Sequence, residues 1–314
     1  MRIFETDGKG TFALSIRSWR AVLFTFLMLT AIIQAEANTN DREAIVLDHP
    51  KQVGMGQPFL VRLTSAQAFD RISVHWMDRK FVPSVSQWNG RHVAIAMLGT
   101  DILTIKSGRQ TLLVRAWTGG KKTVWQRSVI IVARTYPRQE LTLPSKMVTP
   151  PATEIERIKA ERTQTQKAKN TWSEQRLWQL PFHQPVEGKT ISVYGLRRVL
   201  NGKPKNPHRG LDFRAPTGTA VETVADGRVI LAESHYYAGN SMYIDHGNGV
   251  ISLYFHLSRF DVFPGDIVKR GQIIGRSGCT GRATGPHLHL SISVQGQLVD
   301  PAPLFEETTD QLLR

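Results

Sequence analysis

The sequence predicts a mainly β protein: a β-sandwich-like N-terminal domain, a linker helix and a C-terminal antiparallel β domain. Two observations favour this fold class. Short runs of alternating apolar and polar residues recur along most of the chain, and glycine- and asparagine-containing turn signals separate them. The length of 314 residues is sufficient for two domains. A content of 41% hydrophobic and 21% charged residues excludes a wholly disordered or collagen-like chain.

Residues 1–37 are predicted to be a signal peptide. The apolar run Ala21–Ile33 follows Arg17 and Arg20, and an A-x-A pattern ends at Ala37, where we expect cleavage. The run is 13 residues long, whereas a helix needs about 20 to span a bilayer. We therefore expect an exported chain without a transmembrane span after cleavage. An uncleaved membrane anchor is the alternative.

Residues 38–136 are predicted to form the β-sandwich-like accessory domain, because six strand-like runs alternate with turn signals. The expected strands are Ala44–Leu47, Phe59–Leu63, Arg71–Trp76, His92–Met97, Thr111–Trp117 and Val124–Val132. This part has no cluster of catalytic residue types, so we expect it to act as a spacer, a regulator or a substrate-positioning module.

Residues 137–180 are predicted to be a linker with a charged helix. Pro144, Pro150 and Pro151 should break regular structure. Thr153–Glu156 then fits the S/T-x-x-E capping box at a helix start. The following residues are mostly charged or amides, which is typical of a solvated surface helix. We expect a simple linker, and a cover over a functional groove is the alternative.

Residues 181–314 are predicted to fold as an antiparallel β domain with functional loops, since glycines punctuate short β-rich runs and helical periodicity is lacking. The expected strands are Gly227–Leu231, Ser241–Ile244, Ile251–Phe255, Gln272–Ile274 and Leu288–Val294.

A His-x-His pair begins the last of these runs, HLHLSISV. Residues two apart on a strand point to the same face. His287 and His289 should therefore stand side by side, while Leu288 and Leu290 face a core. The same alternation predicts that Tyr254 and His256, which are two residues apart, point to the same face of their strand.

A second cluster, His208 and Asp212, has Gly210 between its members, and a turn there would let both side chains converge. Histidine and aspartate are both good zinc ligands. The single cysteine, Cys279, excludes a cysteine-rich zinc site. Two histidines and a carboxylate would leave a coordination position open for water, as in catalytic zinc sites. Spacing alone does not say which histidines bind the metal.

The motifs HRGLD (208–212), LYFHL (253–257) and TGRATGPHLHL (280–290) resemble the hallmarks of the lysostaphin/LytM-type zinc metallopeptidases. The resemblance covers about 120 residues, roughly 181–304. It implies the duplicated hybrid motif fold and a Zn²⁺ cofactor. It also implies His208, Asp212 and His289 as metal ligands, with His256 and His287 as the catalytic pair.

The resemblance further implies a hydrolase that cuts peptide cross-links of peptidoglycan and so remodels the cell wall. The export signal and the absence of an evident wall-anchoring repeat suggest a Gram-negative periplasm, where the D-alanyl–diaminopimelate bridge would be the substrate. Two alternatives stay open. One is a non-enzymatic or autoinhibited LytM-like regulator of cell-wall amidases, and the other is an exported general protease.

The remaining predictions concern partners. Peptidoglycan stem peptides are the expected substrate, with Arg197, Arg198 and Tyr254 as candidate substrate-binding residues. The net charge of +14 suits an anionic envelope surface, with plain solubility as the alternative. Nucleic acid is not expected as a partner, because aromatic residues do not alternate with the basic ones.

Overall fold

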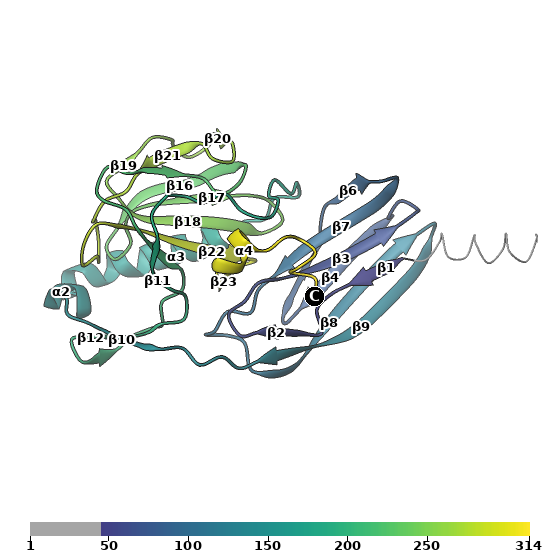
Figure 1. Ribbon diagram of the computed structural model, residues 1–314, viewed down its shortest axis with the longest axis horizontal. Coiled ribbons are helices and arrows are strands. Elements are labelled where there is room, and N and C mark those ends of the chain that lie inside the picture. Colours follow the sequence, from purple (N-terminus) through teal and green to yellow (C-terminus); the bar gives the residue numbers. More distant parts are fainter. Residues whose placement is uncertain (1–44) are drawn as a thin grey trace, which may run out of the picture. The chain divides into compact units, whose positions relative to one another are not determined.

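Strands dominate the computed structural model, which describes residues 45–314, and Val46–Arg314 form one compact unit (Figure 1). The mainly β prediction is confirmed. The predicted signal peptide lies outside the described residues. Within the described part, no helix has the length and apolar character needed to cross a bilayer.

Two sheets form the first part of this unit. The first has the order β1 (Val46–Asp48), β3 (Phe59–Ser65), β7 (Arg91–Leu98) and β6 (Val85–Trp88). The second has the order β2 (Gln52–Gly54), β9 (Lys121–Val132), β8 (Gly108–Thr118), β4 (Arg71–Trp76) and β5 (Arg79–Phe81). Trp76 of the second sheet packs edge-to-face on Phe59 of the first, with ring centroids 5.0 Å apart. All six expected strands are present. The three unexpected ones have only three or four residues, too few to show an alternating pattern.

The predicted linker contains more regular structure than expected. It forms β10 (Arg138–Leu141), α2 (Ser145–Val148), the short 3₁₀ turn Ala152–Glu154 and α3 (Ile155–Lys169). The predicted capping box is wrong, because the first helical turn is 3₁₀ and Glu154 caps α3 without a side-chain hydrogen bond.

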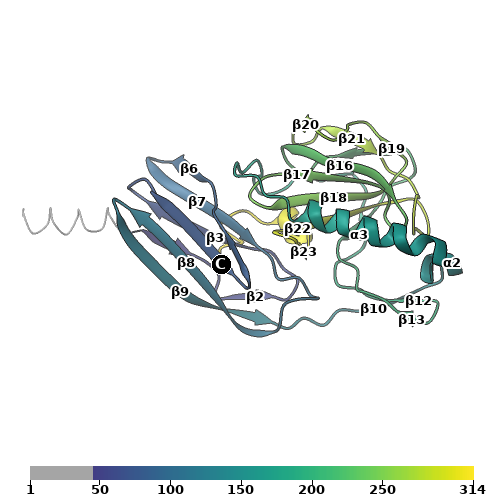
Figure 2. The same ribbon diagram turned by 180° about the vertical axis from the view of Figure 1, so that it is seen from behind.

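The expected charged helix is α3, which lies against β16 of the main C-terminal sheet (Figures 1 and 2). Lys159 pairs with Glu156 along its exposed side at 2.7 Å. Its inner side reaches the sheet, where Thr165 Oγ1 lies 3.1 Å from the Tyr243 hydroxyl and Ala168 is buried. The helix is therefore solvated on one side only.

The C-terminal part is built on one large antiparallel sheet. Its order is β11 (Thr190–Ser192), β14 (Leu211–Arg214), β22 (His287–Val294), β18 (Val250–Leu257), β17 (Gly239–Asp245), β16 (Gly227–His235) and β20 (Ile267–Val268), with β23 (Gln297–Val299) paired to β22. A second sheet holds β15 (Ala220–Glu222), β21 (Ile273–Arg276) and β19 (Arg259–Phe260). A third joins β10 to β12 (Arg197–Leu200) and β13 (Lys203–Pro204), and α4 (Ala302–Glu306) follows β23.

The N-terminal sheets and the C-terminal sheet share one hydrophobic core. Leu60 and Met97 belong to the same buried cluster as Ile292 and Val299. The end of the chain adds a backbone bond, because the Leu60 amide donates to the carbonyl oxygen of Leu312 (3.0 Å). The two parts are thus packed together rather than joined by a linker alone.

Candidate metal centre and groove

The pairing of β14 with β22 builds the centre. Asp212 stands directly opposite His289 in this antiparallel pair, and His208 comes from the loop before β14. Asp212 Oδ1 lies 2.7 Å from His289 Nδ1 and 3.0 Å from His208 Nε2, and the two nitrogens are 2.9 Å apart. All three residues are buried. One point is therefore surrounded by a nitrogen or oxygen atom from each of three side chains.

Hydrogen bonds on the outer side determine which atoms face inward. His208 Nδ1 donates to the carbonyl oxygen of Val193 at 2.9 Å. His289 Nε2 donates to Ser291 Oγ at 2.8 Å, and that hydroxyl in turn donates to the Arg209 carbonyl oxygen. A neutral imidazole has a single N–H. Both inward nitrogens consequently present lone pairs.

Asp212 is held as a carboxylate. Burial raises its pKa, but the neighbouring imidazoles of His208 and His289 outweigh burial and hold the pKa well below its usual range. Arg198 Nη2 donates to the outer oxygen, Oδ2, at 2.9 Å. Burial lowers the pKa of His289 to about 4, so this imidazole is neutral at neutral pH. The centre thus combines nitrogen lone pairs with one negative charge.

Gly210 is needed for a different reason than the predicted turn. It does not have a positive φ. A Cβ at this position would lie 2.3 Å from the Leu290 carbonyl oxygen and 2.7 Å from His289 Nε2. Only glycine lets the loop approach β22 closely enough for His208 to reach Asp212.

The second histidine pair lies beside the centre. The rings of His256 and His287 are 4.7 Å apart, and His287 Nε2 lies 3.8 Å from Asp212 Oδ1. His256 Nδ1 donates to the Thr280 carbonyl oxygen at 2.7 Å, and His287 Nδ1 donates to that of Gly285 at 2.8 Å. Each pairing leaves Nε2 as the free acceptor. Burial, together with the charges of His287 and His289, lowers the pKa of His256 to about 3, so its imidazole is neutral.

A β-bulge brings His256 to this face. Phe255 and His256 of β18 together stand opposite the single residue Ser241 of β17, where the pairing register shifts. His256 has φ +64°, in the left-handed region that non-glycine residues rarely adopt. The bulge puts two successive side chains on the site, since Phe255 also stacks on His289 with centroids 5.2 Å apart.

The prediction that Tyr254 shares a face with His256 is therefore wrong. Tyr254 is fully buried in the core with Leu288 and Leu290, and its hydroxyl accepts a hydrogen bond from the Val224 amide at 3.0 Å. It is a core residue and cannot contact a substrate. The expectation that Leu288 and Leu290 face the core is confirmed.

The two predicted arginines have different surroundings. Arg198 is largely buried and bound to Asp212, so it supports the centre directly. Arg197 is exposed and donates from Nε to the Tyr136 carbonyl oxygen at 3.0 Å. Of the two, Arg198 alone lines the cavities that the described residues form at the centre.

Residues of the predicted linker cover the groove. One cavity of about 130 Å³ contains Asp212, His256 and His287, and its opposite wall comes from the linker. The linker residues in that wall are Gln139, Leu141 and Leu143. A second cavity of about 260 Å³ shares Arg198, His256 and Arg282 with the first. The simple-linker prediction is wrong for these residues, because they line the site.

Several contacts hold this cover in place. β10 pairs in parallel with β12. Leu143 packs with Val148 and Leu200 in a small buried cluster. Asn201 bonds both the amide and the carbonyl group of Leu143, at 2.9 and 2.8 Å. The prolines of this segment led to the prediction of a linker without strands. The strand β10 forms because it pairs with β12, about 60 residues later in the chain.

Arg282 lines both cavities, although the sequence did not indicate it as a site residue. Its guanidinium stacks on Tyr237, 4.4 Å from the ring centroid, and Nη1 lies 3.5 Å from the Met147 carbonyl oxygen of α2. Burial lowers the pKa of Arg282. Its place in the loop just before the His-x-His strand was the available signal.

Residues 206–301 match the sequence model of peptidase family M23. They include all five histidine and aspartate residues of the centre and its neighbouring pair. This segment thus has the sequence pattern of peptidase family M23. The family predicted from the HRGLD, LYFHL and TGRATGPHLHL motifs is therefore confirmed.

The segment that matches the M23 model is similar to named peptidoglycan endopeptidases. It is 51% identical over 94 residues to the peptidoglycan DD-endopeptidase ShyA of Vibrio cholerae, covering 30% of this chain and 22% of ShyA. It is 46% identical over 103 residues to the DD-carboxypeptidase/endopeptidase Mpg of Neisseria meningitidis, covering 33% of this chain and 24% of Mpg. The matched stretches thus span less than a quarter of these relatives.

A crystal structure of a peptidase M23 from Pseudomonas aeruginosa is similar over a larger region. It is 28% identical, with a TM-score of 0.58, and the match covers 76% of this chain and 89% of that one. Because the M23 segment is less than a third of the present chain, the likeness extends well beyond it.

The other histidines of the M23 domain and its N-terminal flank lie outside the centre. His235 is buried at the end of β16 and bonds Gln164 of α3. His183 pairs with Glu222. His246 is fully buried, with Nδ1 donating to the Asp226 carbonyl oxygen (2.7 Å) and Nε2 accepting from Ser252 Oγ (2.7 Å).

His246 should make stability depend on pH. Burial lowers its pKa to about 4, whereas the unfolded value is about 6.5. Between these values the unfolded chain binds a proton that the folded chain does not. The free energy of unfolding should therefore fall as the pH decreases through this window, by at most about 1.4 kcal/mol per pH unit for this group.

Urea unfolding of the metal-free chain between pH 4.5 and 7, followed by tryptophan fluorescence, measures this slope. His246→Gln should reduce it by about one proton. His49→Gln, at a partly exposed position of the accessory part, is the control and should keep the wild-type slope. Equal slopes for His246→Gln and wild type would contradict the prediction.

Proposed function

We propose that this chain is an exported zinc metalloendopeptidase that hydrolyses peptide cross-links of peptidoglycan. The observation that carries the proposal is the convergence of His208 Nε2, Asp212 Oδ1 and His289 Nδ1 within 3.0 Å of one another, beside the His256–His287 pair. The M23 match and the names of the relatives support the reaction class.

The donor set fits a metal ion. Three acceptor atoms face one another, and both imidazole N–H groups are directed outward. Such an arrangement is repulsive unless a cation lies between the lone pairs. Two imidazole nitrogens and one carboxylate oxygen are ligands that Zn²⁺ prefers. We therefore assign His208, Asp212 and His289 as the ligands of Zn²⁺.

The metal would supply a Lewis acid and an acidified water for attack on the amide carbon. The chain's own contribution is proton transfer at His256 and His287. Both imidazoles have Nδ1–H bonded to a backbone carbonyl, so Nε2 of each can accept a proton and later donate it to the leaving amine. The carbonyls fix both rings in this tautomer.

The names of the relatives also favour a particular bond. A DD-endopeptidase cuts between two D-centres, which corresponds to the D-alanyl–diaminopimelate bridge of the stem peptides. We place the enzyme in a Gram-negative periplasm, since the predicted signal would deliver it there. Residues 46–132 contain twelve Lys and Arg but only four Asp and Glu, which supports association with an anionic envelope surface.

Digestion of purified sacculi, with products identified by mass spectrometry, tests the function. We expect loss of cross-linked dimers. A chelator should abolish this loss, and added zinc should restore it.

Asp212→Ala should lose both zinc and activity. His287→Ala should keep zinc but lose activity by about 10²- to 10⁴-fold. Full activity of Asp212→Ala would refute the ligand assignment, and casein cleavage without sacculus cleavage would favour a general protease.

Arg198 should tune the metal affinity through Asp212. Replacing the charged partner of a metal ligand typically weakens binding by about 10- to 100-fold. We expect that loss for Arg198→Gln in a competitive zinc-chelator titration. Arg197→Gln is the matched control, because Arg197 is exposed and bonds the Tyr136 carbonyl oxygen instead of Asp212. Wild-type affinity in Arg198→Gln would show that the contact is irrelevant to the metal.

The cover supports a latent form of the same enzyme. Asp212 and His287 line a cavity of only about 130 Å³, too small for a peptide strand, while Leu141 and Leu143 form part of its wall. We propose that the segment 138–149 must move before substrate binds. The complete set of site residues argues against a regulator that has lost its catalytic function.

Leu143→Asp should open the cover, because burying a carboxylate there is costly. A shift of the opening equilibrium by about 1.4 kcal/mol would raise cleavage of soluble cross-linked muropeptide dimers about tenfold. Thr142→Asp introduces the same charge at an exposed neighbour and should change little. Equal rates in both variants and wild type would remove the argument for latency.

A further inference from the structure

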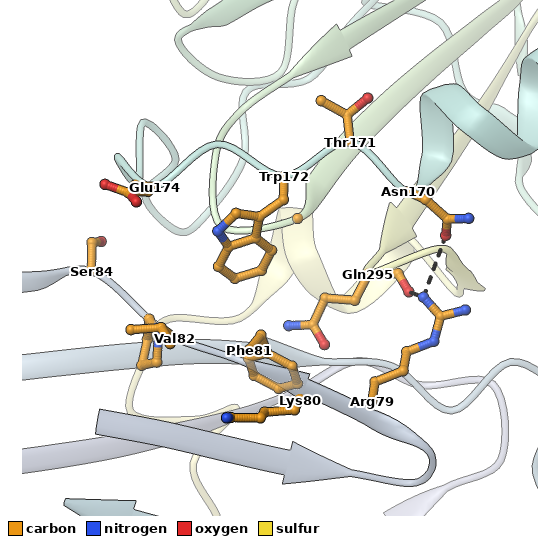
Figure 3. Close-up of a pocket in the computed structure, with 12 residues that line it drawn as sticks. Arg79, Lys80, Phe81, Val82, Ser84, Asn170, Thr171, Trp172, Glu174 and Gln295 are labelled. Atoms are coloured by element: carbon orange, nitrogen blue, oxygen red, sulfur yellow. Dashed lines mark hydrogen bonds between the residues drawn. The ribbon is translucent and has the colours of Figure 1, made fainter. Parts of the chain in front are cut away.

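A larger cavity lies away from the metal centre, where the β4–β5 hairpin approaches Trp172 and the turn after β22 (Figure 3). Its volume of about 770 Å³ is within the usual range of about 300–1,000 Å³ for small-molecule sites. Gln295 in its wall follows β22, six residues after His289. At about 3.3 Å per residue, the cavity is about 20 Å from the metal centre along the same strand.

The walls of this cavity are fixed in advance by hydrogen bonds between distant segments. Arg79 donates to the Gln295 carbonyl oxygen and to Asn170 Oδ1 (Figure 3). The side chain of Asn248 accepts from the Ser84 amide at 2.9 Å and donates to the carbonyl oxygen of Glu174. Four stretches of chain are thus linked around the opening, and a ligand would not have to order them.

An aromatic platform stands in this wall. Trp172 is 38% exposed, and its ring centroid lies 6.1 Å from that of the buried Phe81. Its indole rests on Gly249, where a Cβ would lie 3.1 Å from the ring. The indole is therefore held against the backbone while part of it stays accessible.

Polar groups, both neutral and charged, surround the platform. Within residues 45–314, Trp172 Nε1, Lys80 Nζ and Gln295 Oε1 make no hydrogen bond to the protein, although all three residues line the cavity. The lining has two basic residues and one acidic residue, Glu174. Nη1 of Arg79 donates both of its hydrogen bonds, which hold the guanidinium against Asn170 and Gln295.

We propose that this cavity binds an N-acetylated amino sugar of a glycan strand. A pyranose ring offers one face of C–H groups that can pack on the indole, and its hydroxyl and acetamido groups match the free N–H and amide groups around Trp172. The proposal rests on the proposed function, since peptidoglycan carries its stem peptides on such sugars. The cavity would hold the glycan while the metal centre, about 20 Å along β22, acts on the peptide.

Direct titration of the full chain with tri-N-acetylchitotriose, followed by calorimetry and tryptophan fluorescence, tests the proposal without any catalytic step. Cellotriose, which lacks the acetamido groups, is the ligand control. We expect wild type to bind the acetylated sugar, Trp172→Ala to bind at least about tenfold more weakly, and Trp172→Phe to lie between them. Trp88→Ala removes a tryptophan that is 68% exposed on β6, outside the cavity, and should bind as wild type.

Cleavage assays separate this site from the peptidase function. Trp172→Ala should cleave soluble cross-linked stem-peptide dimers without sugars at the wild-type rate, which also verifies its fold, but should cleave sacculi more slowly. The proposal is overturned if wild type does not bind the acetylated sugar, or if both Trp172 variants bind it as wild type does. Inactivity of wild type on sacculi, with sugar binding intact, would instead refute the proposed function alone.

Discussion

The register between β14 and β22 is the constraint on which the site depends. Asp212 stands opposite His289 only in this register, and a shift by one residue would turn one of the two side chains into the core. The register is secured from the other face of the same strands, where Leu288 and Leu290 are buried. Hydrophobic packing on one side of the sheet therefore holds an electrostatically unfavourable group of lone pairs on the other.

The sequence predicts the strands of both parts well because their patterns are local. Alternation along HLHLSISV places His287 and His289 correctly, and the motifs identify the family. The cluster of His208, Asp212 and His289 follows from the family resemblance, whereas the spacing alone left the choice of histidines open. What makes these atoms meet is the close approach at Gly210, a contact between residues about 80 positions apart.

Two features could not be predicted for physical reasons. The bulge at Phe255–His256 breaks the two-residue period, so an argument from alternation puts Tyr254 at the site and Phe255 in the core, the reverse of the structure. β10 has only four residues near several prolines, and its partner strand is non-local. Local propensity contains no information on either the register shift or the long-range pairing.

The shared core has a consequence for protein engineering. Leu60 and Met97 cover apolar side chains that belong to the peptidase half, among them Ile292 and Val299. Asp101 of the accessory part also accepts hydrogen bonds from Arg209, the neighbour of His208, and from the Leu298 amide. A fragment that begins at the predicted boundary, residue 181, would expose this apolar surface to water. It would also lose the hydrogen bond between Asp101 and Arg209, which holds the loop of His208. The smallest well-behaved unit for recombinant work or domain grafting is consequently the whole stretch from Val46 to Arg314.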